Sequence, residues 1–313
     1  MEQEMTFASI SAPYHAHALA TKYGQHFFTM SKLENLVKLG ATGDGNRRLF
    51  LVGAYIRSGN HHKAIAIYNR LANGFDHTII TLAGSDILQM KRASKKNLSN
   101  LIKFFNRKDV HLAAVGDSLA KEANQLFRLR PEIIYMPLNH DFSEKIHPMP
   151  KKFSVGCYMP ANGSTFYGYD VIVGAAKKMP DVKFYFYGLK GYTPTKRELR
   201  IKNIVWLRQA IKPNRMEDFL KDISCGIRVT DHDGNPMSLA EYNIAGRWFA
   251  YNKKMPYCEH IERRTIESVV KALRNIEKKS DKVNSGREFY IKRHGRRVFV
   301  NHVNKIYSKM TAA

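Results

Sequence analysis

The sequence predicts an α/β fold of two Rossmann-like parallel-sheet domains that face a cleft. Short apolar runs alternate with helix-like stretches along the first half of the chain, and the alternation starts again after a polar, proline-containing segment at residues 140–152. Strands and helices that alternate at this spacing are typical of parallel sheets. A chain of 313 residues, of which 44% are hydrophobic, is also long enough for two domains.

The first predicted domain, residues 1–145, has apolar and β-branched runs that end at turn residues. Gly-Ser-Asp at 84–86 and Gly-Asp-Ser at 116–118 follow two of these runs. Gly43 and Gly45 indicate a turn before the apolar run that begins at residue 49. The predicted strands are residues 6–11, 26–30, 49–55, 77–82, 110–115 and 132–136, and the predicted helices are residues 13–24, 60–71 and 119–129.

The second predicted domain, residues 152–285, repeats this alternation. In open parallel sheets ligands bind beyond the carboxyl ends of the strands, so we expect the loops that follow the strands to line the cleft. The predicted strands are residues 152–158, 182–187, 204–207, 226–230 and 247–251, and the predicted helices are residues 169–179, 213–223 and a helix through Glu241.

The chain is strongly basic in both halves, with 51 Lys and Arg against 27 Asp and Glu and a net charge of +24. Such a surplus attracts polyanions, which favours nucleic acid, an anionic membrane surface or phosphorylated substrates as partners. Charge by itself does not choose among these partners. The alternative is that the basic residues lie on solvated faces, where they keep the protein soluble and bind no partner.

Cys157, Cys225 and Cys258 share no short spacing, so the sequence supports neither a disulfide framework nor a zinc site, and we expect no bound metal. The N-terminal residues lack the basic flank and apolar core of a secretion signal, and no run approaches 18 apolar residues. We therefore expect a soluble or peripheral protein in the cytoplasm.

The stretch DHDGNPMSLAEYNIAGRWFAY, residues 231–251, is the most informative segment of the sequence. A Gly-Asn-Pro turn leads into a helix start near Ser238, where free backbone amides and the positive helix end form an anion site. Asp233 and Glu241 flank this start, and carboxylates accept strong hydrogen bonds from sugar hydroxyls. The alternative is an acidic first turn that complements the helix dipole.

This segment resembles the acid-x7-acid signature of retaining, nucleotide-sugar-dependent glycosyltransferases of the glycogen-synthase-like group, which have the GT-B fold. The resemblance implies that Asp233 contacts the transferred sugar, that Glu241 contacts the nucleotide ribose, and that amides of Met237, Ser238 and Leu239 hold the distal phosphate. Asp233 is shorter than the usual Glu. We also assign three intervening residues to donor binding, namely Gly234, Asn235 and Pro236.

Other segments resemble the same family in the expected order. TLAGSDIL at 81–88 is similar to its His-Gly-(Ser/Thr)-Asp segment, and residues 110–127 and 155–188 are similar to the end of its first domain and the start of its second. The resemblance implies that the last segment, residues 286–313, is a helix that crosses back to the N-terminal domain.

The sequence departs from the family where an Arg and a Lys neutralise the leaving diphosphate. Cys157-Tyr158 and Tyr167-Gly168 stand at those places. The predicted substitutes are Asn162, Ser164 and Thr165, or Lys190 and Arg228 after neighbouring strands. Arg208 is a further predicted donor-binding residue.

His15 and His17 follow the first predicted strand, at a position that faces acceptor and donor sugar in the family. We predict His15 as a catalytic residue and His17 as an acceptor contact, since a positioned His acts as a general base or orients a hydroxyl. Ser85 and Asp86 are the other predicted acceptor contacts. A structural role is the alternative for either histidine.

We predict a nucleotide-diphosphate sugar as the donor and no further cofactor. The first candidate acceptor is hydroxymethylpyrimidine in DNA, as used by phage enzymes of this fold. A phage enzyme would act in the host cytoplasm, and it would have to flip the base out of the duplex to reach the hydroxyl group. A lipid-linked or cell-surface glycan at an anionic membrane is the second acceptor. A nucleic-acid-binding protein without transferase activity is the third reading. We expect the aromatic residues within the basic clusters to lie in the core: Phe104, Phe105, Tyr290, Phe299 and Tyr307.

Overall fold

The computed structural model describes residues 5–9, 27–29, 47–53, 61–138, 142–160, 165–189, 192–207 and 211–312, with backbone alone for 5–9, 27–29, 61–64 and 213. The chain divides into two compact units. The first contains Met1–Asn139, Asp233–Asn235 and Arg296–Ala313, and the second contains His140–His232 and Pro236–Gly295. Each unit holds one parallel sheet, which confirms the predicted α/β fold class.

The first unit contains a six-stranded sheet in the order β2-β1-β3-β4-β5-β6, and every pairing is parallel. The predicted strands are present, but the last is only two residues long. The predicted helix at 13–24 and the turn at Gly43 and Gly45 lie outside the described residues. The strands are β1 (Met5–Ser9), β2 (Phe27–Thr29), β3 (Arg48–Val52), β4 (His77–Leu82), β5 (Val110–Ala114) and β6 (Glu132–Ile133).

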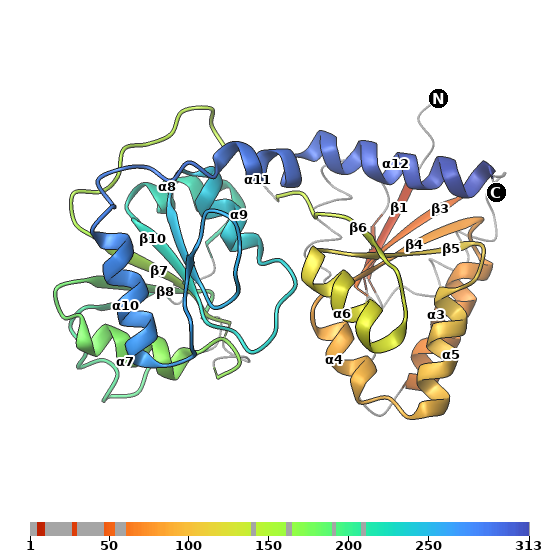
Figure 1. Ribbon diagram of the computed structural model, residues 1–313, viewed down its shortest axis with the longest axis horizontal. Helices are drawn as coiled ribbons and strands as arrows, with labels where there is room; N and C mark the ends of the chain where they lie inside the picture. The colour runs from red at the N-terminus through yellow and green to blue at the C-terminus, as the bar shows by residue number, and fades with distance from the viewer. Residues whose placement is uncertain are drawn as a thin grey trace. The chain divides into compact units, whose positions relative to one another are not determined.

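Helices cover both faces of this sheet, as Figure 1 shows. Leu49 and Leu51 of β3 belong to a core with helices α3 to α6, whereas Phe50 points to the other face and meets the ring of Phe299 in α12 at 5.5 Å. The Tyr307 hydroxyl of α12 donates to the Leu49 carbonyl at 2.7 Å. The helices are α3 (His61–Asn73), α4 (Ser85–Lys91), α5 (Lys95–Phe105), α6 (Asp117–Phe127) and α12 (Arg296–Ala312).

The basic stretch that begins at Lys91 forms the end of α4 and helix α5, which the sequence analysis did not assign. The Ser94 side chain accepts a hydrogen bond from the Asn97 amide and caps α5. The aromatic residues of the basic clusters are buried, which confirms that they belong to the core: Phe104, Phe105, Tyr290, Phe299 and Tyr307.

The second unit contains a six-stranded parallel sheet in the order β12-β11-β10-β7-β8-β9. Read from β9, this is the 3-2-1-4-5-6 order of the Rossmann fold, whose strand order reverses between β7 and β10. The strands are β7 (Ser154–Tyr158), β8 (Lys183–Tyr187), β9 (Ile204–Trp206), β10 (Cys225–Arg228), β11 (Trp248–Tyr251) and β12 (Glu259–His260).

The helices of this unit also cover both faces of the sheet. Val155 and Cys157 of β7 belong to a core with α7 and α10, whereas Gly156 faces Tyr242 of α9. The predicted helix at 213–223 is a 3-10 turn, Pro213–Arg215, followed by α8. The helices are α7 (Tyr169–Lys178), α8 (Met216–Lys221), α9 (Met237–Ile244), α10 (Ile266–Glu277) and α11 (Arg287–His294).

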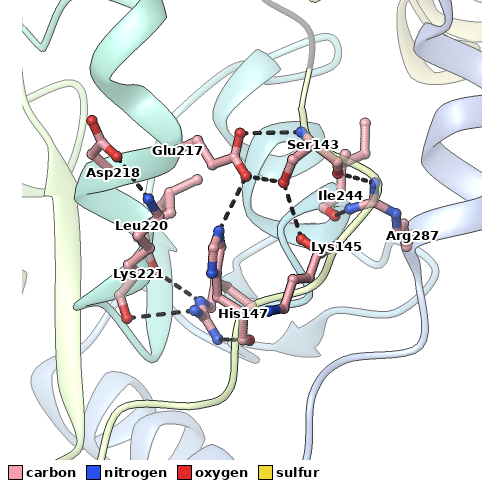
Figure 2. A network of polar contacts seen from close by, with 10 residues as sticks. Ser143, Lys145, His147, Glu217, Asp218, Leu220, Lys221, Ile244 and Arg287 are labelled. Atoms are coloured by element: carbon pink, nitrogen blue, oxygen red, sulfur yellow. Dashed lines mark hydrogen bonds and ion pairs between the residues drawn. The ribbon is translucent and has the colours of Figure 1, made fainter.

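The polar segment that precedes β7 is held within the second unit by the contacts in Figure 2. Glu217 of α8 accepts hydrogen bonds from the Ser143 amide, at 3.1 Å, and the Ser143 hydroxyl, and it lies 3.3 Å from Nε2 of His147. The fully buried Arg247 donates to the carbonyl oxygens of Leu220, at 2.8 Å, and of His147, at 3.1 Å. These bonds fix the segment before the strand begins.

Candidate functional site

The carboxyl ends of β7 and β10 form the switch point of the second sheet. Cys157 pairs with Ile227 in the ladder, so the next residues, Tyr158 and Arg228, emerge side by side at this edge. In doubly wound sheets the crevice at such a point is where ligands bind. The candidate site therefore consists of residues at and just beyond the carboxyl ends of β7 and β10.

Arg228 lies against two tyrosine rings at this edge. Its guanidinium carbon is 4.5 Å from the centre of the Tyr167 ring and 5.9 Å from that of Tyr158. Aromatic rings attract a cation through their negative faces, so the rings position the guanidinium. The two tyrosines occupy the very places where the resemblance led us to look for cations.

The turn that carries Tyr167 is pressed against the end of β10. Gly168 has φ +73°, and a Cβ there would lie 2.4 Å from the Val229 carbonyl oxygen, so only glycine fits. Arg264 bonds the Thr165 carbonyl and pairs with Asp231, which ties the same turn to the loop after β10. The sequence analysis did not single out Arg264, and no local pattern marks it.

Helix α9 begins at Met237, with Pro236 as its N-cap and no side chain capping it. The Leu239 amide donates to the Pro236 carbonyl at 3.1 Å, which corrects the prediction that three consecutive amides face a phosphate. Among the described residues, no acceptor is recorded for the amides of Met237 and Ser238. The helix start therefore offers two amides to an anion.

Glu241 is in the second turn of α9 and is partly exposed. Although the residue keeps some exposure, burial of its carboxyl group raises the pKa of that group to about 7. The pKa of Tyr187, at the end of β8, is raised by burial and then by the charge of Glu241. Glu241 is therefore near enough to Tyr187 to act on its pKa, and its own carboxyl changes charge near neutral pH.

Asp233–Asn235 group with the first unit. The Ser118 hydroxyl donates to the Gly234 carbonyl at 3.0 Å, and a Cβ on Gly234 would lie 2.2 Å from Cδ1 of Leu119. Asp233 and Asn235 are partly exposed and Gly234 is buried. Asp233 and Glu241 therefore belong to different units, although only seven residues lie between them in the sequence.

The predicted acceptor residues of the first unit differ in exposure. Ser85 is exposed at the start of α4. Asp86 is fully buried, and its carboxylate accepts a hydrogen bond from the Ala83 amide at 2.5 Å, so it holds the turn before α4 in place. This placement argues against Asp86 as an acceptor contact, because the core covers its side chain.

Several predicted site residues lie outside the described residues. They are His15, His17, Asn162, Ser164, Lys190 and Arg208. Thr165 is described and exposed. Within the described ranges, no three His, Cys, Asp or Glu side chains come together as metal ligands. In that same part of the chain, no helix is both long and apolar enough to cross a membrane.

The protein resembles known proteins in its structure, but no match is found at the level of sequence. No family model matches the chain, and no curated protein does. TarM superposes with a TM-score of 0.61 at 15% identity, over 88% of this chain and 58% of TarM. Sucrose-phosphate synthase from Thermosynechococcus elongatus superposes with a TM-score of 0.62 at 11% identity, over 99% of this chain and 100% of that one.

The pneumococcal O-GlcNAc transferase GtfA, in complex with UDP and GlcNAc, gives a TM-score of 0.59 at 12% identity, over 90% of this chain and 60% of GtfA. The chain therefore spans about three fifths of the length of TarM and GtfA. At these identities the likeness shows the fold. The chain has the GT-B fold, as its sequence predicts.

Proposed function

We propose that this protein is a glycosyltransferase that moves a sugar from a nucleotide-diphosphate sugar to a hydroxyl group of a polyanionic acceptor. The observation that carries the proposal is the placement of Arg228 by Tyr158 and Tyr167 at the switch point of a Rossmann-ordered sheet. A fixed cation at this crevice suits a diphosphate. A UDP-sugar is the first donor to test, because GtfA was solved with UDP.

The donor is proposed to lie along the carboxyl edge of the second sheet. Arg228 and the amides of Met237 and Ser238 would hold the diphosphate, and Glu241 would accept hydrogen bonds from the ribose hydroxyls. Asp233 would contact the transferred sugar. The loop residues assigned to the same donor are Asn162, Ser164, Thr165, Arg208, Gly234, Asn235 and Pro236.

The proposed transfer retains the configuration of the sugar and needs no metal. The leaving phosphate helps to deprotonate the acceptor hydroxyl on the same face of the ring, while His15 orients that hydroxyl. The protein then contributes positioning and charge stabilisation more than a nucleophile. Arg228 and the start of α9 take the part that a metal ion plays in other diphosphate sites.

The net charge of +24 supports a polyanionic acceptor. Hydroxymethylpyrimidine in DNA is the first candidate, with His17 and Ser85 as acceptor contacts. An enzyme that reaches such a base must flip it from the stack. Since the aromatic residues of both basic clusters are buried, any base-stacking ring would have to come from another part of the chain.

A glycan acceptor at an anionic membrane is the second candidate. It is favoured by the carbohydrates named for the S. aureus TarM variant, which was solved with fondaparinux, alpha-GlcNAc-glycerol and UDP. The basic surface would then contact anionic lipid headgroups.

Release of nucleoside diphosphate tests the proposal. The protein is incubated with UDP-glucose, UDP-GlcNAc and other nucleotide sugars, and we expect slow release of nucleoside diphosphate from one of them, which Arg228→Gln reduces. Hydroxymethylcytosine DNA, hydroxymethyluracil DNA, unmodified DNA and anionic glycans are then compared by mass. If no nucleotide sugar binds or turns over while duplex DNA binds in a salt-dependent way, the protein is a binding module and the transferase proposal is wrong.

A further inference from the structure

A cavity lies in the second unit, at the edge of the sheet opposite the candidate donor site. It has a volume of about 400 Å³ and is lined by Ser154, the first residue of β7, and Lys183, the first residue of β8. Tyr158 is at the other end of β7, so about four residues at ~3.3 Å each, or about 13 Å, separate the two sites along one strand. The volume lies in the range of small-molecule sites.

Three lysines line this cavity, namely Lys152, Lys183 and Lys202. All three are exposed, and within the described residues none of them forms an ion pair. Like charges gathered around one cavity repel one another unless an anion lies among them. An ammonium group is a strong phosphate ligand, so the cluster suits a phosphate group.

The two carboxylates of the lining do not cancel this charge. Asp181 is engaged by Arg274, whose two terminal nitrogens each lie 2.8 Å from one of its oxygens. Asp222 is the second acid of the lining and its side chain is exposed. The lining itself holds three lysines and two aspartates, and one of the aspartates is already paired with Arg274, so the cavity carries a net positive charge.

Aromatic, proline and polar side chains form the rest of the lining. Phe153 and Tyr185 bring aromatic rings to the cavity, and the Tyr185 ring packs edge-on against Phe219 at 6.4 Å. Asn203 fixes the rim, because its side-chain amide donates to the carbonyls of Ala176, Met179 and Val182 at 2.8–2.9 Å. Aromatic faces pack against the C–H faces of a sugar ring, and a fixed rim lowers the entropic cost of binding.

We propose that this cavity binds a phosphorylated sugar unit, with its phosphate among Lys152, Lys183 and Lys202 and its ring against Tyr185. The unit is either a free phosphosugar or the phosphosugar end of a glycan, since both present the same chemistry. The site is separate from the proposed donor site and does not depend on sugar transfer. The protein would then bind a phosphorylated carbohydrate at this edge of the second sheet while a nucleotide sugar occupies the candidate donor site at the other edge.

Binding of hexose 6-phosphate tests this proposal. The full chain is titrated with hexose 6-phosphate, with the neutral hexose and with inorganic phosphate, and binding is followed by NMR. The triple variant Lys152→Gln, Lys183→Gln, Lys202→Gln is compared with a control triple variant, Lys212→Gln, Lys278→Gln, Lys282→Gln, which removes the same charge from exposed lysines of the same unit. We expect at least tenfold weaker binding in the first variant and unchanged binding in the control.

A second variant, Tyr185→Leu, keeps an apolar side chain and removes the ring. We expect it to weaken hexose 6-phosphate binding severalfold and to leave inorganic phosphate binding unchanged. A glycan with terminal phosphosugar is then compared with the free compound, and the tighter of the two identifies the source. Equal losses in both lysine variants, or equal binding of neutral and phosphorylated hexose, overturn the proposal. Donor hydrolysis by the lysine variant reports separately on sugar transfer.

Discussion

The guanidinium of Arg228 lies over the ring of Tyr167, 4.5 Å from its centre. These residues are about sixty positions apart in the chain, and the turn at Gly168 and the end of β10 bring them together. The pair puts a positive charge at the switch point of the sheet although neither Cys157-Tyr158 nor Tyr167-Gly168 supplies a cation. The first prediction follows from this arrangement.

Replacing Arg228 with Gln is expected to weaken UDP binding about tenfold, or ~1.4 kcal/mol, because a charge-assisted contact to the diphosphate is lost. Isothermal titration calorimetry measures the change. Arg293→Gln is the matched control, since Arg293 also lies over an aromatic ring, that of Phe289 at 4.2 Å, but on α11. Equal affinity of wild type and Arg228→Gln would contradict the assignment.

Donor affinity is expected to rise with pH through the titration of Glu241. Burial raises the pKa of this carboxyl to about 7, so it is mostly protonated at pH 6 and mostly ionised at pH 8. Since the ionised form accepts ribose hydroxyls, UDP-glucose affinity should increase by about tenfold over that range and stay flat in Glu241→Gln. UDP-glucose is the right probe because its diphosphate does not titrate there.

Glu241→Gln is also expected to stabilise the protein at high pH. The folded pKa is raised above the usual value of 4.5, so this group favours the folded state below pH 4.5 and loses that contribution as pH rises through 7. The gain in Tm from the variant should thus be larger at pH 8 than at pH 5, by about 2–4 °C. Glu288→Gln, at an exposed position of α11, should show no such dependence.

Gly156 and Tyr242 are expected to be coupled. A Cβ on Gly156 would lie 1.9 Å from the Tyr242 hydroxyl oxygen and 3.1 Å from its Cζ. Gly156→Ala should therefore cost about 2 kcal/mol or more in urea unfolding. Tyr242→Phe removes the nearest atom, so the double variant should recover part of this loss, and strictly additive costs would show that the two do not touch.

Arg247→Lys is expected to destabilise the second unit. Lysine cannot reach the carbonyls of Leu220 and His147 together, and each buried carbonyl left without a donor costs about 1–3 kcal/mol. The urea midpoint should fall, whereas Arg263→Lys, at an exposed position, should leave it unchanged. A midpoint equal to that of the wild type would mean that water replaces the guanidinium.

Some of the candidate site could be read from the sequence. The helix start before Glu241 follows from Gly-Asn-Pro, and α9 begins there. The sequence also shows Tyr158 and Tyr167 at the places where the family has cations. Because aromatic rings attract a guanidinium, these two residues indicated that Arg228 would lie against them. The sequence does not predict the burial of Asp86, because a Gly-Ser-Asp turn has the same residues whether the Asp side chain faces solvent or the core.

The sequence by itself determined the α/β class, because strands and crossover helices are local and leave a periodic apolar pattern. It also determined that the aromatic residues of the basic clusters are buried, since their spacing is helical. Tertiary structure decided which charges are neutralised and which face a cavity. Arg274 pairs with Asp181, 93 positions away, while Lys152, Lys183 and Lys202 gather around one cavity. Contacts between residues so far apart depend on sheet order and register, which local periodicity does not encode.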